Sequence, residues 1–168
     1  MKAPDEICFM ADRMLIKVGK YLRILGYDCE WSLSLRTHDV IHRANREERV
    51  FLTRNTHLAD QYPDVSYVRH ILSTDPVVQL RQVMAEEDLD PHTFLFSRCV
   101  RCNVVLEPVR SKEQIRAFVH PNVYRRYEQF YTCPSCETVF WKGSHVRNTC
   151  RKLEIECPDA ARSGALRT

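Results

Sequence analysis

Short apolar runs alternate with amphipathic segments through the first ninety residues of the chain. Runs of strand length occupy residues 7–11, 28–32, 50–53 and 65–71. Apolar residues recur at helical spacing over residues 14–25, 37–47 and 76–87, and a single turn of helix is expected at 56–60. Alternating strands and helices are typical of a parallel sheet with right-handed crossovers, so the pattern predicts an α/β layer fold.

Polar, glycine and proline residues mark where the expected helices begin and end. Gly26 follows the first helix, as glycine commonly does at a helix C-terminus. Thr37 or Asp39 opens the second helix. Asp75 and Pro76 open the last one, because proline at the first helical position loses no needed N–H. The candidate core positions on the first and last helices are Met14, Leu15, Val18, Leu22, Leu25, Val77, Val78, Leu80 and Val83.

Two Cys-x-x-Cys pairs, separated by a long segment, lie in the second half of the chain. They are formed by Cys99, Cys102, Cys133 and Cys136. Four thiolates suit tetrahedral Zn²⁺ and make a closed, structural site. The second pair continues into a strand-like run that ends at Trp141, which indicates a zinc ribbon. The alternatives are two disulfides or buried thiols, and disulfides are disfavoured because no secretory signal precedes the chain.

Length and charge divide the chain into unequal parts. Its 168 residues suffice for one ordinary domain and a small metal module. We therefore expect an α/β domain over 1–92, a zinc ribbon with a helical insertion over 93–154 and a disordered tail over 155–168. Residues 1–98 carry 13 Lys and Arg against 15 Asp and Glu, whereas residues 99–152 carry 10 against 4. The second part is the one that would attract a polyanion. No apolar run is long enough to span a membrane, so we expect an intracellular protein, cytoplasmic or nuclear.

Four segments deliver polar residues to the carboxyl edge of the predicted sheet, where α/β folds bind their ligands. Asp12 follows the first strand, Asp39 opens the helix after the second, Asn55 follows the third, and Asp75 opens the helix after the fourth. Gathered carboxylates repel one another unless a cation compensates, so we expect Asp12 and Asp39 to hold Mg²⁺ or Mn²⁺. Lys17 is placed to meet a phosphate there. The competing interpretation is that Asp39 and Asp75 are simply helix caps.

Cations and aromatic rings are interleaved in the second half of the chain. Cations hold phosphates and rings stack on unpaired bases, so this mixture suits single-stranded nucleic acid. The alternative is that the aromatic residues fill the small ribbon core, as we expect for Tyr127 and Phe130. The candidate RNA contacts of the whole chain are Arg13, Lys20, Arg54, Arg125, Arg126, Lys142, Ser144, His145 and Arg147.

Taken together, these motifs resemble the Mut-seven C-terminal RNase family, a PIN-like nuclease domain fused to a zinc ribbon. The matching segments are Asp12–Lys17 with Tyr21–Asp28, Phe51–Asn55, Asp75–Leu80, the two cysteine pairs, and Trp141–His145. The resemblance covers about residues 7–152. It implies an α/β fold with a PIN-like parallel sheet flanked by helices, followed by a C-terminal four-cysteine zinc ribbon.

The resemblance implies a metal-dependent ribonuclease that hydrolyses RNA phosphodiester bonds, with the ribbon binding the RNA. The carboxylates Asp12, Asp39 and Asp75 and the side chains of Asn55 and Lys17 would form its catalytic site. The family pattern has an aspartate where this chain has Asn55, and a neutral oxygen binds a metal ion more weakly. The alternative is therefore a catalytically weak RNA-binding module of a larger 3′–5′ exonuclease of the Nibbler type, which trims small RNAs. Its partners would then include an exonuclease domain in the same parent chain or another protein. A third interpretation is a protein-docking ribbon that binds no nucleic acid.

Overall fold

A computed structural model describes residues 7–156 of the chain. The contacts divide it into two compact units, residues 1–105 and 106–168. Almost all of the predicted disordered tail, residues 157–168, lies outside the described residues. Each unit is described by itself below.

The first unit is built on a four-stranded parallel sheet, as the apolar pattern predicts. Its strands are β1 (Cys8–Ala11), β2 (Asp28–Glu30), β3 (Val50–Thr53) and β4 (Val68–His70), in the order β2-β1-β3-β4. The register pairs Met10 with Phe51 and Phe51 with Val68. Every strand therefore ends at the same edge, and the residues that follow the strands are brought together there.

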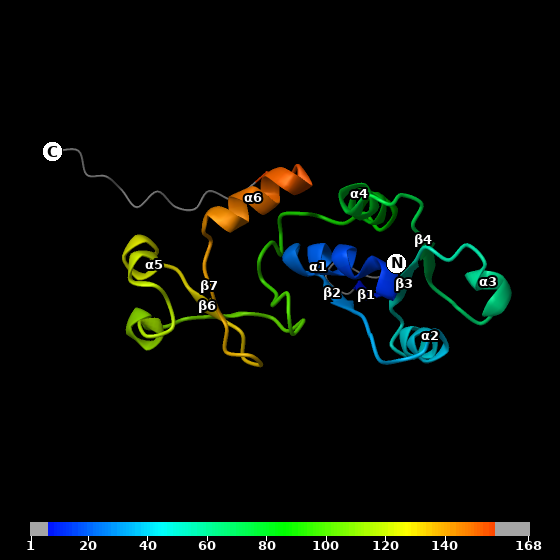
Figure 1. Ribbon diagram of the computed structural model, residues 1–168, viewed down its shortest axis with the longest axis horizontal. Coiled ribbons are helices and arrows are strands. Elements are labelled where there is room, and N and C mark those ends of the chain that lie inside the picture. The colour runs from blue at the N-terminus through cyan, green and yellow to red at the C-terminus, as the bar shows by residue number, and fades with distance from the viewer. Residues whose placement is uncertain (1–6, 157–168) are drawn as a thin grey trace. The chain divides into compact units, whose positions relative to one another are not determined.

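Helices cover both faces of this sheet (Figure 1). A 3₁₀ turn, η2 (Arg13–Leu15), leads into α1 (Ile16–Ile24), which contacts α4 (Pro76–Glu86) on one face. On the other face lie α2 (Thr37–Arg46) and the short α3 (Leu58–Gln61). The core on that face is formed by Met10, Val40, Ile41, Ala44, Phe51 and Leu58. Burial of these side chains is the main favourable term that holds the layers together.

Two of the predicted core positions are wrong. Met14 is 62% exposed because the chain forms a 3₁₀ turn there, which rotates the residue off the apolar stripe of the following helix. Val78, in the first turn of α4, is 47% exposed. Gly26 does end the first helix, with a φ of +93°, and a Cβ there would lie 2.1 Å from the carbonyl oxygen of Phe94. Only glycine fits this turn.

The first cysteine pair packs with the α/β unit rather than with the ribbon strands. The guanidinium of Arg23, a buried residue of α1, donates hydrogen bonds to the carbonyls of Cys29, Val100 and Arg101 at 2.6, 2.9 and 3.0 Å. The buried amide of Asn103 accepts from the backbone N–H of Cys29 and donates to Asp28. The compact units consequently divide at residue 105, whereas the sequence places the boundary at 92.

Replacing Arg23 by methionine should destabilise the first unit by about 2–4 kcal/mol. The apolar side chain fills a similar volume but leaves three carbonyls without a donor, and two of them belong to the first cysteine loop. Urea unfolding followed by circular dichroism measures the loss. Lys20→Met, on the exposed face of the same helix, is the control and should change stability by less than about 0.5 kcal/mol. Equal stability of the two variants would contradict the role assigned to Arg23.

The second unit contains a three-stranded antiparallel sheet and short helices. Its strands are β5 (Glu107–Pro108), β6 (Tyr131–Thr132) and β7 (Val139–Phe140). The segment between β5 and β6 holds the helical insertion expected there, which consists of η3 (Lys112–Ile115) and α5 (Pro121–Arg126). Helix α6 (Ser144–Leu153) follows β7. Phe130 is buried as expected, whereas Tyr127 is only half-buried. Within residues 7–156, no helix is long and apolar enough to cross a membrane.

Candidate functional site

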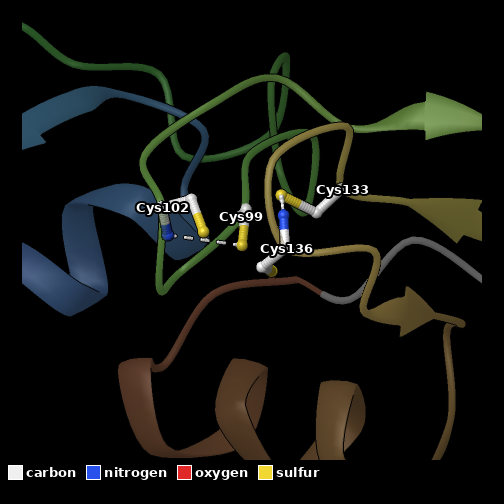
Figure 2. Close-up of side chains that lie close together, drawn as sticks. All are labelled: Cys99, Cys102, Cys133 and Cys136. Atoms are coloured by element: carbon white, nitrogen blue, oxygen red, sulfur yellow. Dashed lines mark hydrogen bonds between the residues drawn. The ribbon is translucent and has the colours of Figure 1, made fainter.

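The four cysteines of the two pairs converge on one point (Figure 2). The sulfur atoms of Cys99, Cys102, Cys133 and Cys136 all lie within 4.8 Å of one another. Zinc–sulfur bonds of about 2.3 Å in a tetrahedron place sulfurs about 3.8 Å apart, so the cluster has the size of a zinc site. None of the four is joined in a disulfide in the structure. Cys99 and Cys133 are buried, and the other two are half-buried.

The two cysteine loops share one hydrogen-bond pattern. In each loop the backbone N–H of the second cysteine points to the sulfur of the first at 3.4 Å. The residue after each pair, Asn103 or Glu137, returns its N–H to the carbonyl of the first cysteine at 2.9 Å and has a positive φ. N–H groups directed at sulfur favour the thiolate form that a metal ion requires. The donor set and its backbone support therefore fit Zn²⁺, which would have a structural role in a site closed by four protein ligands.

A carboxylate and a hydroxyl meet at the carboxyl edge of the sheet in the first unit. Asp12 directly follows β1, and its backbone N–H donates to the carbonyl of Leu52 at 2.9 Å. The hydroxyl of Thr53, the last residue of β3, donates to the Asp12 carboxylate at 3.0 Å. Thr53 is fully buried, whereas Asp12 is half-buried. The strand ends thus hold one oxygen of Asp12 in place and leave the other without a hydrogen bond from the described residues.

Asp39 and Asp75 differ in what their carboxylates do. Asp75 is the N-cap of α4, and its Oδ1 accepts from the backbone N–H groups of Val77 and Val78 at 2.8 and 3.1 Å. The Asp39 carboxylate caps no helix. Asp39 is exposed in the first turn of α2, and its Oδ1 lies 3.6 Å from Nδ1 of His38. Among residues 7–156, groups of three or more potential ligands occur only at the four cysteines. Asp12, Asp39 and Asp75 therefore do not form a three-carboxylate cluster.

A family model, described as the Mut7-C RNAse domain, matches residues 7–153. The chain belongs to this family. No curated protein and no solved structure gives a significant match. The Mut7-C domain is an RNase domain, and the family therefore implies RNA as the substrate class.

Asn55 stands where the resemblance described above leads us to expect an aspartate, and its side chain is engaged within its own loop. Its Oδ1 accepts from the backbone N–H of His57 at 3.0 Å, and its Nδ2 approaches Gln61 at 3.4 Å. Its backbone N–H donates to the Thr53 hydroxyl that holds Asp12. Asn55 therefore supports the loop beside Asp12, and its amide oxygen is occupied.

The basic residues predicted to contact RNA lie in different environments. Arg13, Lys17 and Lys20 are exposed on η2 and α1. Arg54 is half-buried, and its Nε has no hydrogen-bond partner. The remaining candidates lie in the second unit: Arg125, Arg126, Ser144 and Arg147 are exposed, Lys142 is half-buried, and the side chain of His145 lies outside the described residues.

Sequence reasoning did not identify two residues at the edge that carries Asp12. The sequence pattern places Thr53 at the end of the third strand and His70 within the fourth, and it gives neither a role in the site. His70 ends β4 in register with Thr53, and its buried Nδ1 has no hydrogen-bond partner. A buried ring nitrogen without a partner is uncommon and often indicates an unobserved ligand or water. Only strand register, which local patterns do not reveal, places His70 beside Thr53.

Proposed function

We propose that the chain is a metal-dependent ribonuclease that hydrolyses RNA phosphodiester bonds at the carboxyl edge of its parallel sheet. The observation that carries the proposal is the Asp12 carboxylate, held by buried Thr53 in a chain of the Mut7-C RNAse domain family. In α/β sheets this edge is where ligands bind. A half-buried carboxylate with one oxygen fixed and one unoccupied is suited to bind a cation.

Asp12 is the first ligand of the proposed Mg²⁺ or Mn²⁺ ion, and Asp39 the second. A small hollow beside Asp12 supports the first of these ligands. It is lined also by Arg13, Ser32 and Thr37, whereas Asp39 is not among its lining residues. One or two carboxylates suffice for such an ion, because waters and substrate phosphates complete its coordination. When bound, the ion would lower the pKa of a coordinated water and offset phosphate charge. Lys17 and Arg13 would attract the RNA backbone.

The proposal is tested by incubating zinc-loaded protein with labelled single-stranded RNA. Cleavage should require added Mg²⁺ or Mn²⁺ and stop when Ca²⁺ replaces them. The zinc content must be measured throughout, so that a loss of activity is not caused by removal of the structural metal. RNA that stays intact with either cation would contradict the proposal.

A second function, RNA binding with little or no cleavage, is favoured by the environment of Asn55. Its amide oxygen is occupied by the His57 N–H, and a neutral oxygen is a weaker metal ligand than a carboxylate. The chain would then present RNA to an exonuclease domain in the same parent chain or in a partner protein.

Changing Asn55 to aspartate separates these two functions. Aspartate can accept the same hydrogen bond from His57 and adds a charge beside Asp12. If the missing carboxylate limits catalysis, Asn55→Asp should raise the cleavage rate about tenfold or more in a gel assay. Asn55→Ser, which can retain the loop hydrogen bond without the charge, is the control. An unchanged rate for Asn55→Asp would show that Asn55 does not limit activity.

Both functions place the RNA backbone against the exposed arginines of the second unit. Reversing two charges, Arg125→Glu with Arg126→Glu, should weaken the binding of single-stranded RNA about tenfold or more at 50 mM salt. The plot of log affinity against log salt should also become shallower. The control, Arg46→Glu with Arg81→Glu, changes net charge equally on exposed residues of the first unit. Equal losses in both variants would mean that net charge, rather than this surface, governs binding.

A further inference from the structure

The second unit contains a cavity that none of the functions above uses. Its volume is about 570 Å³. It lies between β5, η3 and the second cysteine loop, and its apolar lining includes Pro108, Val109, Ile115, Phe118, Pro134 and Val139. A cavity of this size accommodates a group as large as a nucleotide.

Phe118 gives this cavity an exposed aromatic ring. The side chain lines the cavity and is nevertheless 74% exposed, whereas Ile115, three residues earlier, is buried. Folding of the unit therefore does not account for a phenylalanine at position 118. An exposed ring beside a cavity is a surface on which a flat, apolar face can stack.

Polar side chains without partners also line the cavity. Glu107, Arg110, Gln114 and Glu137 make no side-chain hydrogen bond or ion pair with the described residues. Together they offer two carboxylate acceptors, an amide that donates and accepts, and one cation. This is the set of groups that recognises the edge of a nucleobase and its adjoining phosphate.

We infer that this cavity binds one unpaired nucleobase of single-stranded RNA, stacked on Phe118. The inference rests on the proposed function, because it takes RNA as the substrate class. Residues 99–152 carry a net positive charge that favours a polyanion over an acidic peptide, whereas the lining of the cavity itself carries two carboxylates and one arginine. Arg110 meets the phosphate, and Gln114 contacts the base edge.

The two carboxylates also determine which bases fit. The carboxylates of Glu107 and Glu137 accept hydrogen bonds and donate none, so they favour a base with an exocyclic amino group. Cytosine presents such a group where uracil presents a carbonyl oxygen. The cavity should therefore bind cytosine more tightly than uracil. Both bases have a single ring of the same size, so this comparison tests the edge groups and not the stacking area.

Fluorescence anisotropy with labelled RNA 12-mers tests the stacking. Phe118→Ala should weaken the binding of oligo(C) about tenfold, and Phe118→Trp should restore it. RNA of the same length with abasic sites keeps its phosphates, so the alanine variant should bind it as wild type does. Tyr67→Ala removes an exposed aromatic residue of the first unit and is the matched control, with no change expected. Circular dichroism and zinc content verify that each variant is folded.

The base preference gives an independent measurement. Wild type should bind oligo(C) at least about fivefold more tightly than oligo(U). The double variant Glu107→Gln with Glu137→Gln should lose that preference, because an amide both donates and accepts. Equal affinity of wild type and Phe118→Ala for oligo(C) would overturn the inference while leaving RNA binding intact.

Failure of both functions proposed above, RNA cleavage and RNA binding, gives a different result. In that case wild type would bind neither the base-bearing nor the abasic RNA. The cavity is then probed directly by saturation-transfer NMR with cytidine monophosphate. Transfer that disappears in Phe118→Ala supports the nucleobase site, and no transfer with wild type overturns it.

Discussion

The substitution Cys136→Ser is expected to release the zinc ion and to destabilise the second unit by roughly 5 kcal/mol or more. The unit has three strands of two residues each and few buried side chains, so burial alone contributes little to its stability. A four-thiolate zinc site supplies folding free energy directly, because the ligands do not converge in the unfolded chain. Three remaining cysteines bind Zn²⁺ far more weakly.

Two measurements check this result. Elemental analysis should find one zinc per chain in wild type and none in Cys136→Ser. NMR spectra should lose the dispersed amide signals of residues 106–156. Cys150→Ser is the control: Cys150 is buried in the same unit but lies outside the cluster, so this variant should keep its zinc. Stoichiometric zinc in Cys136→Ser would contradict the assignment of the four ligands.

Removal of zinc should also lower the stability of the first unit. The loop of Cys99 and Cys102 is bonded to α1 and β2 through Arg23 and Asn103. When the loop loses its metal, these hydrogen bonds lose a fixed partner. The melting temperature of the α/β unit should therefore fall in Cys136→Ser, though by less than that of the second unit.

The fold of the first unit could be predicted because local patterns determine it. Each strand is a short apolar run, and each helix has an apolar stripe with a recognisable start or end, such as Gly26 and Asp75-Pro76. The structure departs from the apolar pattern where local backbone geometry or long-range contacts intervene. Met14 lies in a 3₁₀ turn, and the first cysteine loop joins the first unit through hydrogen bonds to Arg23 that span more than seventy residues.

The candidate sites were predictable to different degrees for the same reason. The four cysteines could be assigned from spacing, since one ion satisfies both pairs. The acidic edge follows from strand order, but the role of each carboxylate depends on its neighbours. Asp75 is used as a cap and Asp39 is not, although both had been candidates for either role. The cavity beside Phe118 is formed by residues brought together only by the fold of the ribbon.

Replacing Asp12 by asparagine should lower the rate of RNA cleavage by about a hundredfold or more. Asparagine can still accept the hydrogen bond from Thr53, so the fold is expected to be unchanged while the charge that binds the cation is lost. The measurement is single-turnover cleavage with saturating Mg²⁺, together with the Mg²⁺ concentration for half-maximal rate. Thr53→Val should give a smaller loss, because it removes only the positioning of Asp12.

Asp75→Asn provides the comparison that separates a charge effect at Asp12 from a general loss of carboxylates. Asparagine caps a helix about as well as aspartate, so α4 should remain intact. Because the carboxylate of Asp75 is held by two N–H groups of α4, its loss should change the rate by less than about threefold. A decrease as large as that of Asp12→Asn would mean that Asp75 belongs to the catalytic site. Equal rates for wild type and Asp12→Asn would remove the basis for cleavage at this edge of the sheet and leave RNA binding as the function of the chain.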